Sequence, residues 1–129
     1  MILVDTCVLI EYFKEEPGVT EIIKNIGNKN IALNSIIIME LISGARDKIE
    51  LNSIKKRLNK FQILGIDQAV LDDASSLMEN FYLSHGLKIP DAIIAGTARF
   101  YSTPLYTHNK KDFQFIPGIE FFTYKPHRF

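Results

Sequence analysis

The 129-residue sequence contains no tryptophan, a single cysteine and no excess charge of either sign. The one cysteine, Cys7, cannot form an internal disulfide, which excludes the disulfide-rich class of small secreted proteins. No apolar run approaches the roughly 18 residues that a membrane span needs, and Asp5 follows the start too closely for a secretory signal. We therefore expect a protein that acts in the cytoplasm, without a membrane partner. We interpret Cys7 as a small buried residue rather than a nucleophile.

The balance of fifteen basic and fifteen acidic residues leaves no global basic field that would attract nucleic acid. Any contact with RNA phosphates must therefore be local. Lys110 and Lys111, next to Asp112, are the first candidates. Two further basic groups are a helix cluster, for which a solvated helix face is the better explanation, and the C-terminus: Lys55, Lys56, Arg57 and Lys60, then Lys125, His127 and Arg128.

Seven glycines and five prolines are few, and they punctuate the chain without forming a linker. Apolar residues make up 47% of the sequence, which is enough for one core, so we expect a single domain over residues 1–129. Hydrophobic periodicity predicts strands at 2–4, 31–33, 61–64, 105–107 and near 119, and helices at 6–13, 19–25, 36–60 (a pair), 68–85 and 90–101. This alternation predicts an α/β fold, a three-layer α/β/α sandwich with a mainly parallel central sheet.

Four acidic residues share one kind of local setting, an apolar run that ends in, or opens around, a single carboxylate. Asp5 ends the first predicted strand, where open α/β sheets bind ligands. Glu40 lies about one turn into an apolar helix, and Asp91 lies in the first turn of another, just after Pro90. Asp112 follows a short strand near residue 105. We expect Glu40 and Asp91 to be buried on most sides, because their neighbours are so apolar.

Bringing four carboxylates into one pocket is electrostatically expensive. At about 5 Å and an effective dielectric near 20, each pair repels by about 3 kcal/mol, so six pairs approach roughly 20 kcal/mol. That exceeds the ~5 to 15 kcal/mol stability of a typical domain. A single acidic residue beside an apolar helix is usually a cap or part of a solvated face. Four together favour a site for a hard divalent cation, Mg²⁺ or Mn²⁺.

The segments around these residues resemble, in order and spacing, those of the PIN-domain ribonucleases, and most closely the VapC-type toxins of prokaryotic toxin–antitoxin pairs. The matching strings are LVDT at 3–6, SIIIMEL at 35–41, IPDAIIA at 89–95 and THNKKDF at 107–113. The resemblance covers essentially the whole chain. His108 is a small departure, because many relatives have arginine or another polar residue there.

The resemblance implies a metal-dependent endoribonuclease in which Asp5, Glu40, Asp91 and Asp112 hold Mg²⁺ or Mn²⁺. Polar residues near the metal would be Thr6, Ser35, Thr107 and Asn109. It also implies a partner, a VapB-like antitoxin whose C-terminal segment lies in a groove over the first helices and reaches the acidic site.

Fourteen aromatic residues are many for a chain of this size. Adjacent residues on a helix or strand point in different directions, so adjacent aromatic pairs cannot all face one core. These pairs are Tyr12-Phe13, Phe81-Tyr82, Phe100-Tyr101 and Phe121-Phe122. We expect some of them to be buried in an interface with another chain, for example in a homodimer.

Other classes of function fit the sequence less well. A receiver or phosphatase domain phosphorylated on Asp5 would carry a second carboxylate after the first strand, which the segment Asp5-Thr6-Cys7 lacks. A catalytically silent PIN-like binding module would be expected to lack an acidic ligand, and all four are present. A PIN nuclease that processes RNA outside a toxin–antitoxin pair remains open.

Overall fold

The computed structural model describes residues 1–124, so the candidate phosphate contacts Lys125, His127 and Arg128 lie outside the described residues. Within that range four short strands form one sheet in the order β3-β2-β1-β4, and every pairing is parallel. The strands are β1 (Ile2–Val4), β2 (Ile31–Leu33), β3 (Gln62–Ile63) and β4 (Leu105–Tyr106). The predicted parallel α/β sheet is confirmed.

In the described part of the chain, six helices connect and flank these strands. They are α1 (Thr6–Phe13), α2 (Pro17–Ile26), α3 (Ser35–Ser43), α4 (Lys48–Leu58), α5 (Gln68–His85) and α6 (Ile89–Phe100), with short 3₁₀ turns η1 (Asn28–Asn30) and η2 (Lys110–Asp112). Side-chain caps fix several starts, because Asp5, Asn34, Asp47 and Asp67 each accept a backbone N–H of the helix that follows. Pro90 lies in the first turn of α6, as the sequence predicts, whereas α2 begins at Pro17, two residues before the predicted start at residue 19.

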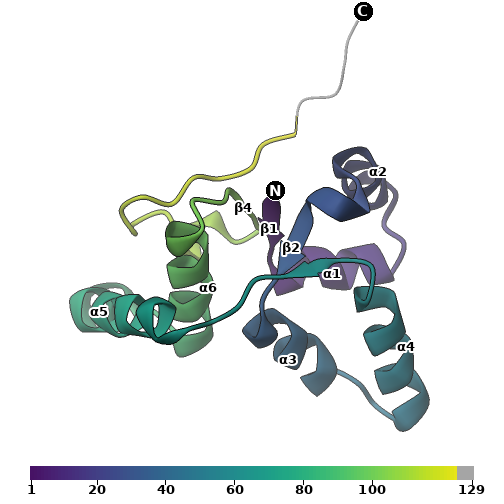
Figure 1. Ribbon diagram of the computed structural model, residues 1–129, viewed down its shortest axis with the longest axis horizontal. Coiled ribbons are helices and arrows are strands. Elements are labelled where there is room, and N and C mark those ends of the chain that lie inside the picture. Colours follow the sequence, from purple (N-terminus) through teal and green to yellow (C-terminus); the bar gives the residue numbers. More distant parts are fainter. Residues whose placement is uncertain (125–129) are drawn as a thin grey trace, which may run out of the picture.

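The helices form two layers around the sheet. The chain moves from β1 to β2 to β3 in one direction and then crosses back to β4, so right-handed crossovers place α1 to α4 on one face and α5 and α6 on the other. Figure 1 shows α5 and α6 together on one side of the strands and α1, α2 and α4 on the opposite side. This is the predicted α/β/α sandwich.

The reversal of direction puts a crevice between the carboxyl ends of β1 and β4. Such a switch point is where open α/β sheets form ligand sites. The strands are held in place by fully buried side chains, among them Leu3, Val4 and Leu105. On the far layer α6 packs closely on α5, since a Cβ added at Gly96 would lie 3.0 Å from the Val70 carbonyl oxygen. The crevice therefore has rigid walls.

The strand predicted near residue 119 is wrong. That segment meets the sheet two residues later, in one isolated parallel bridge between Leu105 and Phe121. Two backbone hydrogen bonds hold it there, from Leu105 N–H to Glu120 O (2.8 Å) and from Phe122 N–H to Leu105 O (2.9 Å). Because β4 has only two residues, it offers too short a ladder for a fifth full strand.

Candidate active site

Asp5 lies at the switch point, directly after β1, and is 6% exposed. Its carboxylate accepts the Thr6 backbone N–H and the Thr107 hydroxyl, both at 2.8 Å. Thr107 follows β4, so this second bond joins the carboxyl ends of the neighbouring strands β1 and β4. Asp5 thus combines three roles: it caps α1, ties β1 to β4, and presents its carboxylate in the crevice.

Glu40 reaches the same crevice from the middle of α3. The Thr6 hydroxyl donates to Glu40 Oε1 at 2.9 Å, while the Thr6 backbone N–H binds Asp5. Thr6 therefore links two of the four predicted ligands. Glu40 is only partly buried, and so is Asp91, contrary to the expectation that both would be enclosed on most sides. The most buried carboxylate is Asp5, because it lies inside the sheet edge rather than on a helix face.

Asp91 lies in the first turn of α6, as predicted. Burial, followed by the negative charges of Asp5, Asp112 and Glu40 in that order of importance, raises its pKa to about 7. Lys88 acts in the opposite direction. The four carboxylates thus come from four separate segments and lie close enough together to influence one protonation equilibrium.

Asp112, in η2, is exposed at the rim of this group. The polar residues predicted to lie near the metal differ in whether they contact a carboxylate. Thr6 and Thr107 contact carboxylates directly, whereas Asn109 contributes its backbone N–H, which donates to the Thr107 hydroxyl at 3.0 Å. Ser35 is exposed, and the side chain that caps α3 is that of Asn34.

A buried hydrogen bond fixes the two ligand-bearing helices to each other. Asn34 is fully buried; its Oδ1 accepts the Ile37 N–H, and its Nδ2 donates to the Thr97 hydroxyl at 3.0 Å. Thr97 is also buried and donates to the Ile93 carbonyl oxygen on its own helix. This contact sets the position of α3 relative to α6, and hence of Glu40 relative to Asp91. In the sequence the only signal was a capping asparagine.

Among the described residues, no basic side chain forms an ion pair with the four carboxylates. Within residues 1–124 the ion pairs join other residues, and none involves Asp5, Glu40, Asp91 or Asp112. The same residues contain no group of three Asp, Glu, His or Cys side chains that already meets at one point as a metal site requires. A bound cation would draw the side chains of partly buried Glu40 and exposed Asp112 toward Asp5 and Asp91. Uncompensated carboxylate oxygens are the donors that Mg²⁺ and Mn²⁺ prefer, so the residues present fit such an ion.

Cys7 lies beside the carboxylates, with Sγ 3.5 Å from Asp5 Oδ2. Burial, followed by the charge of Asp5, raises the pKa of the Cys7 thiol, which agrees with a neutral packing residue rather than a nucleophile. Next to it, His108 Nε2 lies 2.6 Å from Glu11 Oε2. This pair joins the loop after β4 to α1, and the sequence alone did not indicate it.

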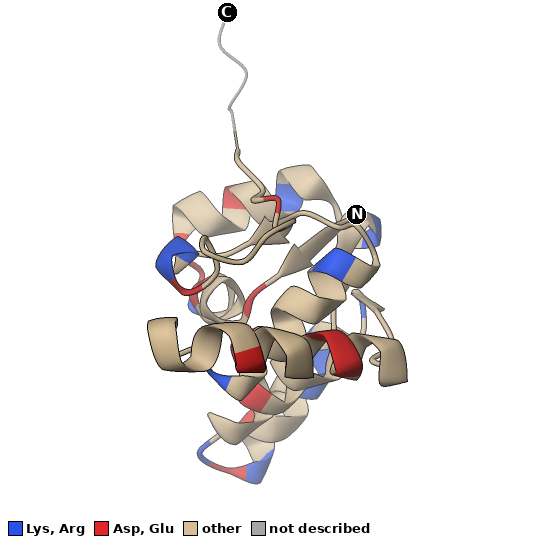
Figure 2. Cartoon of the chain, turned by 90° about the vertical axis from the view of Figure 1, so that its left-hand side faces the viewer, with Lys and Arg blue, Asp and Glu red and all other residues tan. Residues whose placement is uncertain are grey.

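The basic candidates differ in their surroundings. Lys110 lies over the Phe121 ring, 5.6 Å from its centroid, whereas Lys111 lines a cavity together with Asp91 and Asp112. In the α4 cluster Lys55 and Lys56 are exposed, as a solvated face requires. The last two members of that cluster pack on aromatic rings instead: Arg57 over Phe13 and Lys60 over Tyr12. Figure 2 shows basic and acidic positions interspersed over one face, in keeping with the absence of net charge.

Comparisons with known proteins agree with this geometry. The family model of the PIN domain matches residues 2–118. The chain is 32% identical over 115 residues to the ribonuclease VapC1 of Methanocaldococcus jannaschii, a match that covers 88% of this chain and 79% of the relative.

Solved structures give the same result. A toxin–antitoxin complex from Klebsiella pneumoniae contains a chain with a TM-score of 0.77 and 30% identity, over 92% of this chain and 95% of that one. VapBC2 from Rickettsia felis, bound to a DNA fragment from its promoter, has a TM-score of 0.78 at 23% identity, over 97% of this chain and all of that one, and supports the fold alone. The chain belongs to the PIN-domain family and, within it, to the VapC type.

Proposed function

We propose that this protein is a Mg²⁺- or Mn²⁺-dependent endoribonuclease and the toxin of a VapBC-type pair. The observation that carries this proposal is the set of four carboxylates around Asp91, which come from four segments of the chain and have no basic partner among the described residues. Repulsion within such a set is relieved by a bound cation or by a proton on Asp91. The name of the M. jannaschii relative supplies the reaction class.

Asp5, Glu40, Asp91 and Asp112 would hold the metal. When bound, the ion would activate a water for in-line attack on a phosphodiester and stabilise the leaving oxygen. The protein's own contribution is orientation. Thr6 binds Asp5 through its backbone N–H and Glu40 through its hydroxyl, and Thr107 fixes the other oxygen of Asp5. These bonds limit the rotation of two carboxylates before a cation arrives.

The direct test is to incubate a panel of structured cellular RNAs with the protein in Mg²⁺, in Mn²⁺ or in EDTA. Site-specific cleavage in either metal and none in EDTA is the expected result. Metal-independent cleavage would contradict the metal role, and intact RNA under all conditions would contradict the enzyme class.

A groove between α1, α3 and α4 is the proposed site of a VapB-like antitoxin. It is a cavity of about 410 Å³ whose apolar lining includes Ile10, Phe13, Leu41 and Ile54. Glu40 also lines it, so an inserted segment can reach the carboxylates, where a basic side chain would compete with the metal. The structural neighbours named as toxin–antitoxin complexes support such a partner.

Ile10→Glu should weaken binding of the cognate antitoxin at least about 100-fold, because it places a charge in the apolar lining of the groove. Ile10 is 42% exposed, so the variant should still fold. Ile49→Glu is the matched control, since Ile49 is 82% exposed on α4 and does not line the groove. Titration of RNA cleavage with the antitoxin measures both. Equal inhibition of the two variants would place the antitoxin elsewhere, and a nuclease indifferent to the antitoxin would favour an RNA-processing role.

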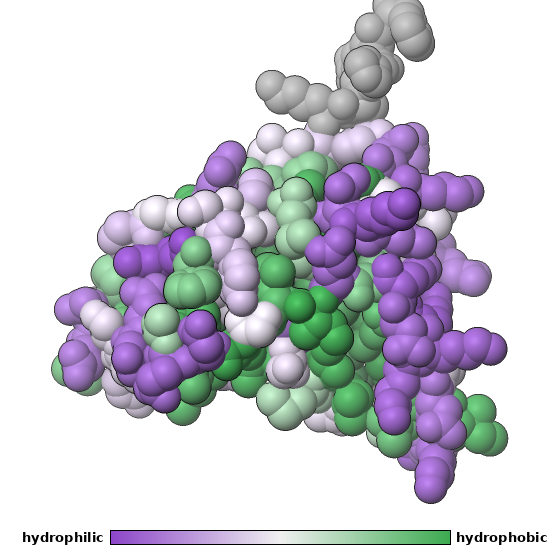
Figure 3. Space-filling model, viewed as in Figure 1, coloured by the Kyte–Doolittle hydropathy of each residue, from purple (hydrophilic) through white to green (hydrophobic). Residues whose placement is uncertain are grey.

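We also propose that the chain is one domain that forms a homodimer and works in the cytoplasm. Figure 3 shows apolar atoms gathered over the middle of one face, between the α5 side and the α4 side. Large exposed apolar residues of the chain include Met39, Ile63, Tyr82 and Phe100. We expect light scattering to give twice the mass of the chain in the absence of antitoxin; the monomer mass would rule out the dimer.

Among the described residues no helix is long and apolar enough to cross a membrane.

A further inference from the structure

One of the four carboxylates, that of Asp112, lies in a part of the chain with little support from the rest of the fold. The other three end a strand or lie on helices. Asp112 belongs instead to a 3₁₀ turn within the segment 108–112, where every residue is exposed. Buried Thr107 and Phe113, with 4% and 0% exposure, anchor its two ends. Between these anchors the position of the Asp112 carboxylate depends on how the segment itself is held.

His108, the first residue of this segment, is joined to α1 at two points. Its backbone N–H donates to Cys7 Sγ at 3.5 Å, and its ring Nε2 lies 2.6 Å from Glu11 Oε2, where Nε2–H donates to the carboxylate. Cys7 and Glu11 are four residues apart and therefore lie on the same face of α1. The imidazole also meets the Tyr106 ring nearly at a right angle, with centroids 5.7 Å apart. These contacts fix both the backbone and the ring of His108.

The other side chains of the segment have weaker support. The Lys110 ammonium lies over the Phe121 ring, 5.6 Å from its centroid, and such a contact contributes little at an exposed site. Among the described residues, the pair His108–Glu11 is the only hydrogen bond or ion pair between a side chain of the segment and another element. It is therefore the main side-chain contact that holds the segment against α1.

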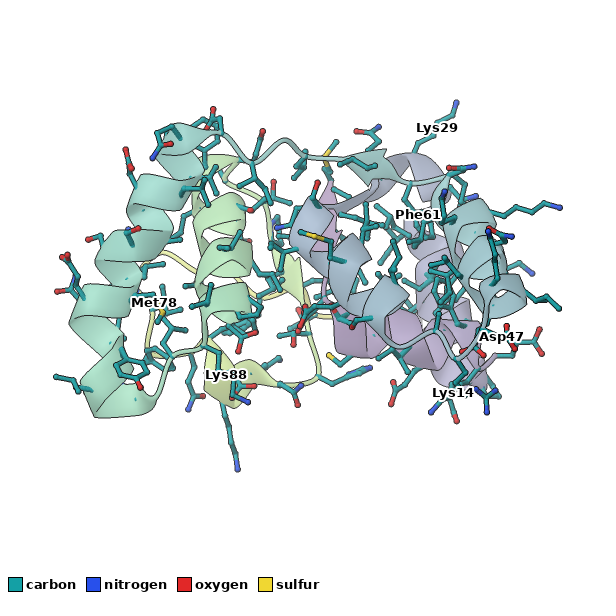
Figure 4. All side chains as sticks on the ribbon, turned by 90° about the horizontal axis from the view of Figure 1, so that it is seen from below. Lys14, Lys29, Asp47, Phe61, Met78 and Lys88 are labelled. Atoms are coloured by element: carbon teal, nitrogen blue, oxygen red, sulfur yellow. The ribbon has the colours of Figure 1, made fainter. Side chains whose placement is uncertain are left out.

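On its other side the segment lies next to the start of α6. Figure 4 shows it in yellow-green beside Lys88, the residue that precedes α6. Lys111 and Asp112 line one small cavity, of about 40 Å³, together with Lys88 and Asp91. The two walls of this cavity are close together, so a displacement of the segment toward solvent would move Asp112 away from Asp91.

A contribution to overall stability does not explain the pair well. Both side chains are substantially exposed, His108 at 38% and Glu11 at 45%, and exposed pairs usually contribute little. Because Thr107 and Phe113 anchor the segment at both ends, loss of the pair should leave the fold intact. Its consequence is local, because it frees the exposed residues between the anchors, and Asp112 is one of them.

We propose that His108 is a positioning residue for the metal site. Through Glu11 it holds the segment 108–112 against α1, so that Asp112 stays within reach of a cation bound beside Asp91. This rests on the proposed function and adds a residue to it. In this role His108 contacts neither metal nor substrate and acts through Asp112. Outer contacts that orient a metal ligand commonly change metal affinity about 10-fold or more.

The first measurement needs no metal. Steady-state ¹⁵N–¹H NOE values of amides 109–112 in EDTA report how firmly the segment is held. His108→Ala and Glu11→Ala should lower these values, whereas His108→Arg should keep them near native, because arginine also donates to Glu11. Gln114→Ala is the control, since Gln114 is exposed and lies just beyond the segment. Thermal unfolding midpoints of all four variants should stay within about 4 °C of the native value.

The second measurement is calorimetric titration with Mg²⁺. His108→Ala should bind the ion about 10-fold more weakly than the native protein, and His108→Arg should restore the affinity. In the Asp112→Asn background, His108→Ala should have no further effect, because the ligand that it positions is no longer present. This cycle distinguishes positioning of Asp112 from a general loosening of the site.

Two results would overturn the inference and leave the nuclease intact, provided that the native protein cleaves RNA in Mg²⁺ or Mn²⁺. The first is an NOE profile that His108→Ala does not change, or that His108→Arg lowers as much as His108→Ala does. The second is an equal loss of Mg²⁺ affinity with and without Asp112. If the native protein neither binds these ions nor cleaves RNA, the proposed function fails and the metal role of His108 with it, while the NOE values still show whether His108 holds the segment.

Discussion

Asp91→Asn is expected to reduce metal-stimulated RNA cleavage by at least about 100-fold while the protein keeps its fold. The charges of the other three carboxylates all raise the pKa of Asp91, so its own charge is one that a bound metal would neutralise. Asparagine has nearly the same shape but no charge, and it removes repulsion rather than packing. Cleavage rates measured in Mg²⁺ and in EDTA, with circular dichroism of both proteins, give the result.

Two controls make the result specific. Glu79→Gln removes an exposed acid from α5 without touching the site and should retain the native rate. Asp5→Asn should lose activity as Asp91→Asn does, because asparagine keeps an oxygen for the Thr6 N–H, and hence the cap of α1, but lacks the charge. A native cleavage rate in Asp91→Asn would show that this carboxylate does not bind the catalytic metal.

Much of this arrangement could be predicted because each ligand stands next to a strong local signal. The apolar strand β1 stops at Asp5, and Pro90 begins α6 just before Asp91. These two signals place both carboxylates in the fold to within a residue. Alternation of strands and helices then fixes the parallel sheet, and parallel strands end at one edge. Proximity of Asp5 to Thr107, 102 residues apart, follows from the topology rather than from either segment alone.

Burial and partners could not be predicted in the same way. Glu40 is surrounded by apolar residues in sequence, yet it lies on the partly open side of α3, because helix rotation is set by the contact between Asn34 and Thr97. The contact of His108 with Glu11 likewise depends on where a loop crosses a helix. Such contacts join residues 63 to 97 positions apart, and no local pattern encodes them.

The pH dependence of metal-free stability provides the second large test. In the folded protein the pKa of Asp91 is about 7, against an ordinary value of 3.8. Between these values the folded state holds a proton that the unfolded state has lost, so stability should fall as the pH rises from about 4 to 7 and then level off. Asp91→Asn has no carboxyl group at this position, so its stability should not fall in this way as the pH rises. In EDTA at pH 8 it should be more stable than the native protein by about 1 to 2 kcal/mol, a value reduced for the partial exposure of the carboxyl group.

The affinity for metal should rise with pH, whereas metal-free stability falls, because both depend on the proton bound to Asp91. A cation must displace the proton from Asp91, so the apparent affinity for Mg²⁺ should be roughly 30-fold lower at pH 5.5 than at pH 8, as competition with one group of pKa near 7 requires. Every other titratable group is present in both proteins, so the difference between native and Asp91→Asn melting curves isolates Asp91. Calorimetric titration with Mg²⁺ and thermal melts from pH 4 to 8 measure the two effects. A native protein more stable than Asp91→Asn at pH 8 without metal would mean that the carboxylates are not close enough to repel one another, and the cation would then have no charge to neutralise.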